Sequence, residues 1–94
     1  MPRGVILVDY TDQGRRTIAD SPDRAEASKA EAAKLGVHVK DLFYTPGGPH
    51  DAAMIIEAEG PESINKLMAS VQSLGNVKMK FIRAFSIEEM RKMV

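Results

Sequence analysis

The order of the predicted elements indicates an α+β fold, a ferredoxin-like βαββαβ sandwich followed by a short C-terminal helix. Three observations lead to this prediction. Four short apolar segments have the pattern of strands, two longer segments have helical periodicity, and the turn-forming stretch TPGGPHD (45–51) joins the second strand to the third. Right-handed crossovers arrange these elements into a four-stranded antiparallel sheet with both helices on one face. We expect strands one and three at its centre, parallel to each other.

The first strand and the first helix have clear boundaries. The segment from Val5 to Tyr10 is apolar and β-branched without a helical period, which predicts a buried strand. A loop with room for one short helical turn follows. Ser21 is then the expected N-cap of a helix, Pro22 fits its first position, and Gly36 ends it.

The second and third strands form a predicted hairpin. The apolar alternation of the second strand, residues 37–44, changes phase after Val39, which predicts a β-bulge near Lys40 and Asp41. The third strand covers 52–58. Because only the stretch of turn residues separates the two strands, we expect them to pair as a hairpin.

The last third of the chain contains a helix, a strand and a short helix. The segment 60–76 has apolar residues at the three-and-four spacing of one buried face, namely Ile64, Leu67, Met68, Val71 and Leu74. In residues 77–82, Val77, Met79 and Phe81 alternate with Lys78, Lys80 and Ile82, as in a strand with one buried face. Ser86 and Glu89 form an S-x-x-E capping box that predicts a final helix through Met93.

The composition limits the classes of function. The length predicts one domain over residues 1–94. The 13 basic and 13 acidic residues balance, and this balance makes nucleic acid an improbable partner. The absence of cysteine excludes disulfides, thiolate metal sites and a thiol nucleophile. The first apolar run is too short for a signal peptide or a membrane span, so we expect a cytoplasmic protein without a membrane partner. No phosphate-binding glycine motif occurs, so we expect no cofactor. The chain has two histidines and no carboxylates at a matching spacing, so we expect no metal site.

The second face of the sheet carries more apolar residues than a solvated face should. The two central strands are apolar on both phases, at Val5, Ile6, Leu7, Val8, Ala53, Met54, Ile55 and Ile56. An apolar sheet face that helices leave uncovered marks an interaction surface. We therefore predict a two-fold homodimer in which two sheets face each other as a dimeric α/β barrel, with the last helix across the seam. Whether such dimers build larger oligomers stays open.

Several segments resemble the GYD domain family of the dimeric α/β-barrel superfamily. They are YTDQGRR, DSPDRAEA, KDLFYTPGGPHD, SLGNV and RAFSIEEMR, which together extend from Tyr10 to Arg91. The family signature is Gly, a variable residue, Tyr and Asp, and the matching positions here are Gly48, Pro49, His50 and Asp51. Histidine thus replaces the tyrosine of the signature. The resemblance implies a ferredoxin-like fold and oligomers built through the sheet, and it implies no particular activity.

A candidate ligand site lies at the hairpin end of the predicted sheet. We expect Tyr44, His50, Asp51 and Arg83 to meet there and to bind a small polar or aromatic ligand, with the imidazole able to transfer a proton near neutrality. Adjacent strand residues point to opposite faces, so His50 and Asp51 should not pair with each other. The simpler interpretation is structural: His50 begins the strand at its rim, and Asp51 accepts hydrogen bonds from loop amides.

Two functions remain open from the sequence. The first is a non-enzymatic homo-oligomeric module that binds a small molecule or other proteins. The alternative is a cofactor-independent enzyme that performs proton transfer or oxidation on a small apolar or aromatic substrate near His50. An enclosed pocket with His50 or Arg83 exposed inside would favour the enzyme, and a barrel filled by side chains would favour the module.

Overall fold

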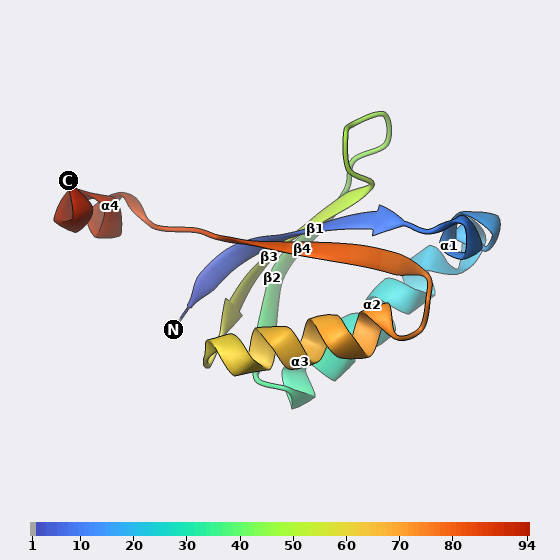
Figure 1. The fold of residues 1–94 in the computed structure, drawn as a ribbon, viewed down its shortest axis with the longest axis horizontal. Helices are drawn as coiled ribbons and strands as arrows, with labels where there is room; N and C mark the ends of the chain where they lie inside the picture. Colours follow the sequence, from blue (N-terminus) through green and yellow to red (C-terminus); the bar gives the residue numbers. More distant parts are fainter. Residues whose placement is uncertain (1) are drawn as a thin grey trace.

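Four antiparallel strands form one open sheet, and two helices cover one of its faces (Figure 1). This computed structural model describes residues 2–94. The sheet has the order β2-β3-β1-β4 and confirms the predicted ferredoxin-like arrangement. The strands are β1 (Arg3–Tyr10), β2 (Val37–Tyr44), β3 (Ala52–Ala58) and β4 (Val77–Arg83). The helices are α1 (Asp12–Arg16), the 3-10 turn η1 (Ile18–Asp20), α2 (Ser21–Lys34), α3 (Pro61–Gln72) and α4 (Ile87–Met93).

The central strands β1 and β3 run antiparallel, so the prediction that they are parallel was wrong. Gly4 pairs with Ile56, and Val8 pairs with Ala52. The crossover through α2 makes β1 parallel to β2, and the hairpin then reverses the chain into β3. The end of β1 therefore lies beside the start of β3. The end of β4 lies instead beside the start of β1.

The predicted β-bulge in β2 is confirmed. The register with β3 shifts between Val39 and Asp41. Before the shift Val39 is opposite Ile56, and after it Leu42 is opposite Met54. The extra residue thus keeps apolar side chains on the helix-covered face along the whole strand.

The hydrophobic core lies between the sheet and the two long helices. Its fully buried members are Ile6, Ala32, Val37, Met54, Ile56, Ala58, Ile64 and Leu67. Burial of one side chain such as Leu67 contributes about 1.5–3 kcal/mol to folding. Leu74 was expected in the same stripe, but its side chain is 66% exposed because α3 ends at Gln72. Among residues 2–94, no helix combines the length and apolarity needed to cross a membrane.

Ser21 is not the N-cap of α2, contrary to the prediction. The turn η1 leads directly into α2, and the Ser21 amide already donates a hydrogen bond to the Ile18 carbonyl. Ser21 has helical dihedral angles, φ −57° and ψ −43°. Asp20 is the N-cap instead and makes no capping hydrogen bond with its side chain. The hydroxyl of Ser21 is therefore available for other contacts.

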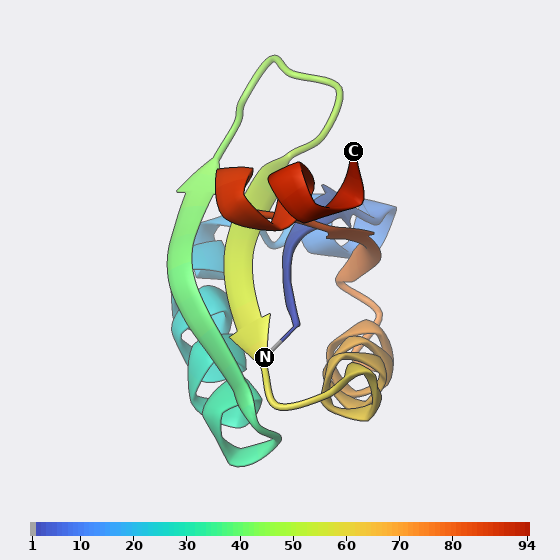
Figure 2. The same cartoon turned by 90° about the vertical axis from the view of Figure 1, so that its left-hand side faces the viewer.

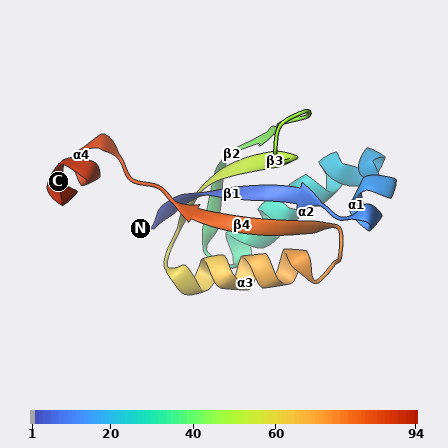
Figure 3. The same cartoon turned by 45° about the horizontal axis from the view of Figure 1, so that its top comes forward.

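The last helix, α4, projects beyond the end of β4 and away from α2 and α3 (Figures 2 and 3). The predicted capping box is confirmed: Ser86 Oγ accepts from the Glu89 amide at 3.1 Å, and Glu89 Oε1 accepts from the Ser86 amide at 2.8 Å. The apolar side chains of this segment are exposed, at Phe85, Ile87, Met90, Met93 and Val94. The helix is thus formed by local interactions and leaves its apolar face uncovered within the chain.

Candidate functional site

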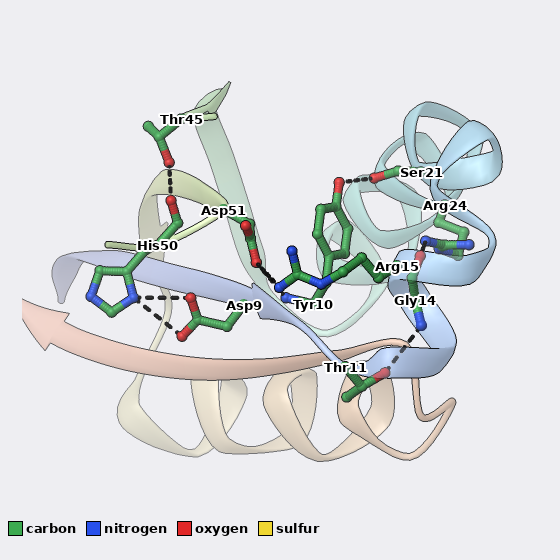
Figure 4. A network of polar contacts seen from close by, with 10 residues as sticks. All are labelled: Asp9, Tyr10, Thr11, Gly14, Arg15, Ser21, Arg24, Thr45, His50 and Asp51. Carbon is green, nitrogen blue, oxygen red and sulfur yellow. Dashed lines mark hydrogen bonds and ion pairs between the residues drawn. The ribbon is translucent and has the colours of Figure 1, made fainter. Parts of the chain in front are cut away.

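Polar groups from two distant segments meet where β1 ends and β3 begins (Figure 4). His50 Nδ1 lies 3.1 Å and 3.2 Å from the two carboxylate oxygens of Asp9. The backbone amide of Tyr10 donates to Asp51 Oδ2 at 2.8 Å. His50 and Asp51 thus contact β1 separately, as expected for adjacent residues that point in different directions.

Asp9 and Tyr10, at the end of β1, point to different faces of the sheet. Because side chains alternate along a strand, Asp9 lies on the uncovered face with His50, and Tyr10 points toward α2. Arg15 Nη2 lies 3.7 Å from Asp51 Oδ2 and adds an exposed ion pair to this end of the sheet. Asp51 thus accepts a backbone amide, but from strand β1 and not from the loop as the structural interpretation expected.

The structure places three of the four predicted site residues at the hairpin end, but on different faces of the sheet. Tyr44 points to the helix-covered side, where it contacts Ser21, whereas His50 contacts Asp9 on the uncovered face. Arg83 pairs with Gly4 at the opposite end of the sheet. The expectation that Arg83 joins the cluster was therefore wrong, and it followed from the wrong direction of the central strands. The Arg83 guanidinium lies instead 5.3 Å from the centre of the Phe85 ring. A ligand role for the other three residues stays a prediction.

The hairpin loop is held by its own hydrogen bonds. Thr45 Oγ1 donates to the His50 carbonyl at 2.6 Å, and the Thr45 amide donates to the Asp51 carbonyl at 2.9 Å. Gly47 has a φ of +83°, a backbone conformation that glycine adopts without strain. The turn residues of this stretch therefore have a structural role, and the loop positions His50 over Asp9.

A cavity of about 150 Å³ lies on the helix-covered side at the same end of the sheet. Its walls come from β1, β2, β3, β4, α2 and α3 and are mostly apolar. Its polar groups include a chain of hydroxyls: Tyr10 lies 2.8 Å from Ser21, and Ser21 lies 3.1 Å from Tyr44. Of the predicted site residues that the structure describes, Tyr44 lines this cavity, whereas His50 and Arg83 do not.

The sequence did not indicate the positions of Asp9 and Tyr10 or the contacts of Ser21. Parallel central strands, as predicted, would place Asp9 and Tyr10 at the sheet end opposite the hairpin, although the hairpin and the right-handed crossover together require the end of β1 beside the start of β3. No local pattern indicated the contacts of Ser21. Within the part of the chain that the structure describes, no three side chains of His, Asp or Glu are grouped to hold a metal ion.

The face of the sheet opposite the helices has an apolar centre, and we call it the open face. Val5 pairs with both Ile55 and Ile82, and Phe43 pairs with Ala53, so apolar side chains adjoin across all four strands. Charged residues surround this centre, with Arg3 and Lys40 at 3.5 Å and 3.7 Å from Glu57. The apolar members of the open face are Val5, Leu7, Phe43, Ala53, Ile55 and Ile82.

Comparison with known proteins supports the fold and identifies the family. The family model for the GYD domain matches residues 5–94. The chain is 29% identical over 91 residues to the glutamine synthetase and cystathionine beta-lyase binding protein of Thermus thermophilus, in an alignment that covers 96% of this chain and 95% of the relative. The crystal structure of TTHA0845 from the same organism superposes with a TM-score of 0.57 at 19% identity, covering 92% of this chain and 95% of that one. The chain belongs to the GYD domain family.

Proposed function

We propose that the protein is an interaction module that pairs with a second copy of itself through the open face and, as a dimer, binds other proteins. The observation that carries this proposal is the apolar centre of the open face. Phe43 is 57% exposed, Ile82 48% and Ile55 40%, although all three belong to the sheet. A contiguous apolar surface of this kind in water favours a partner that covers it.

A second copy is the partner that the geometry supports best. Two identical open faces related by a two-fold axis present the same apolar centre to each other, and each charged rim then surrounds the contact. Such a pair would form the dimeric α/β barrel, since the sheet of one chain is open. A stable dimer should bury at least about 1,200 Å² in total.

The projecting helix supports the same assembly. Ile87, Met90 and Met93 recur at intervals of three and lie on one side of α4, where the chain itself provides no cover. The segment that carries α4 extends past the end of the sheet, away from α2 and α3, so that it could reach a second copy (Figure 1). We propose that each α4 packs its apolar side on the other copy.

Other proteins are the second class of proposed partner. The relative from Thermus thermophilus is named for its binding of glutamine synthetase and cystathionine beta-lyase, and it aligns over almost the whole chain. These two enzymes are therefore the first candidates. Calorimetric titration of each purified enzyme with the protein at two temperatures would measure binding, because apolar contacts can release no heat at one temperature. An absence of heat at both temperatures and micromolar concentrations with both enzymes would remove them as partners.

Sedimentation equilibrium tests the dimer directly. We expect the wild type to sediment as a dimer at micromolar concentrations and Ile55→Lys to sediment as a monomer, because the lysine would be buried without a partner. Ile18→Lys is the matched control, since Ile18 is 53% exposed on η1, away from the open face. A monomeric wild type would refute the proposal, and so would an equal effect of the two lysines in variants that circular dichroism shows to be folded.

The proposal does not include catalysis. The enzymatic alternative predicted that His50 or Arg83 is exposed inside a cavity, and neither lines the cavity that residues 2–94 form beneath the sheet. A cytoplasmic location stays a prediction based on a composition without cysteine.

A further inference from the structure

We propose that the cavity beneath the sheet is a binding site for a small, neutral, single-ring molecule with one hydrogen-bond acceptor, such as a cyclic ketone. This site lies on the opposite side of the sheet from the open face. It therefore does not depend on the proposed protein contacts.

The three hydroxyls at the cavity have one hydrogen more than their mutual contacts use. Tyr10, Ser21 and Tyr44 form two contacts, at 2.8 Å and 3.1 Å. Each contact uses one hydroxyl hydrogen, and each hydroxyl has one to donate. Whichever direction the two bonds take, the third hydrogen has no acceptor within the chain of hydroxyls. All three residues line the cavity, so the spare donor is available to an oxygen of a bound molecule.

The position of Ser21 makes this donor group part of the cavity wall. The residue is only 8% exposed, and its hydroxyl does not cap α2. Two tyrosines from different strands, β1 and β2, converge on it from the sheet. The hydroxyl group is thus fixed by three separate elements, as in a site that orients a ligand.

The size and the walls of the cavity select an apolar ring. A closed cavity of about 150 Å³ with apolar walls accommodates a molecule the size of benzene. The cavity here has about the same volume, 150 Å³, but is partly open to solvent, and Val8, Leu42, Met54 and Met79 provide apolar surface around the hydroxyls. A ring with a single polar atom would satisfy both the walls and the spare donor.

The apolar walls favour a neutral ligand, and the guanidinium beside them is tied to Thr17 and Gly14. Arg24 lines the cavity, but its guanidinium donates to the Thr17 carbonyl at 3.0 Å, to Thr17 Oγ1 at 2.9 Å and to the Gly14 carbonyl at 3.2 Å. A carboxylate placed among the apolar walls would have hydroxyls but no free countercharge, and desolvation of an unpaired charge is costly.

Titration followed by amide chemical shifts in NMR tests the proposal with three ring compounds of similar size. Cyclohexanone has the acceptor, methylenecyclohexane lacks it, and cyclohexanecarboxylate replaces it with a charge. We expect shifts at cavity residues with both neutral compounds and weaker binding of the carboxylate. The hydrocarbon gains more than the ketone from leaving water, so the contribution of the hydroxyls is the change in the ketone-to-hydrocarbon affinity ratio when the hydroxyls are removed. Tightest binding of the carboxylate, or no shift at the cavity with the ketone, would overturn the proposal.

Two variants locate the binding. The triple variant Tyr10→Phe, Ser21→Ala, Tyr44→Phe keeps the walls but removes the hydroxyls, so the ketone-to-hydrocarbon affinity ratio should fall about tenfold below its wild-type value, the effect of one hydrogen bond. Ala25→Leu should fill the cavity and abolish binding of both compounds. Ile18→Lys should bind as the wild type does. If the triple variant folds and keeps the wild-type ratio, the hydroxyls are not the donor and the proposal fails. The comparison of the ketone with the carboxylate on the wild type stands without any variant and remains valid if the protein proves monomeric.

Discussion

His50 Nδ1 lies 3.1 Å from Asp9 Oδ1, a contact that joins the hairpin loop to the end of a strand 41 residues earlier in the chain. The side chains are 30% and 43% exposed, so water screens the interaction. We therefore expect His50→Ala to lower the free energy of unfolding by no more than about 1 kcal/mol, the usual range for an exposed pair. Urea denaturation of both single variants and of the double variant with Asp9→Asn would measure the coupling. A coupling well above this range would contradict the prediction.

Asp51 should matter more to stability than His50. Its carboxylate accepts the partly buried amide of Tyr10, and removal of the acceptor leaves that amide without its partner. We expect Asp51→Ala to lower the free energy of unfolding by about 1–3 kcal/mol. Asp51→Asn retains an oxygen acceptor and should recover part of this loss in the same urea experiment. Equal stability of the alanine variant and the wild type would show that water replaces the carboxylate.

Gly14 permits the close approach of α1 to the loop before β4. A Cβ atom at this position would meet the carbonyl oxygen of Asn76, which is backbone and cannot rotate away. We expect Gly14→Ala to destabilise the protein by about 1–3 kcal/mol through this overlap, measured by thermal or urea unfolding. Gly60→Ala is the control, because its Cβ would meet nothing within 4 Å and its φ of −169° is extended backbone. Gly60 is the N-cap of α3, where alanine is less favourable than glycine, so a loss of about 0.5 kcal/mol is expected there. Similar losses in both variants would argue against a steric cause.

The final helix should lose stability in acid. The hydrogen bond from the Ser86 amide holds the pKa of the Glu89 carboxyl below its ordinary value of 4.5. Because the pKa is lower in the folded state, this contribution is fully present above pH 4.5 and is lost as the pH falls through the lower folded value.

Carbon chemical shifts of residues 87–93, followed by NMR from neutral pH to about pH 3, would report the helix content of α4 across the range in which the carboxyl protonates. Glu89→Gln keeps an acceptor but does not ionise, so the pH dependence should be smaller in this variant. A helix that melts at the same pH in both proteins would exclude the Glu89 carboxylate as the cause.

Local patterns in the sequence were sufficient for the elements and for one irregularity. The change of phase after Val39 predicted the β-bulge, and the spacing of Ser86 and Glu89 predicted the capping box. Both features depend on residues a few positions apart. For that reason they are visible in the sequence without knowledge of the tertiary contacts.

The composition of the site depended on long-range geometry. The wrong direction assigned to the central strands moved Asp9 and Tyr10 to the far end of the sheet and brought Arg83 to the near end. Ser21 has the residue type and position of an N-cap, and its actual contacts are two tyrosines that lie 11 and 23 residues away along the chain. The role of this serine is therefore determined by its contacts with two distant tyrosines and not by its preference for the N-cap of a helix.

The bulge in β2 affects what can add to this border of the sheet. β2 is an edge strand, and the irregularity at residues 39–41 interrupts the even row of amide and carbonyl groups that an added strand would need. Lys40 and Asp41 place charges at the same point. Continuous growth of the sheet into fibrils along this border is therefore disfavoured.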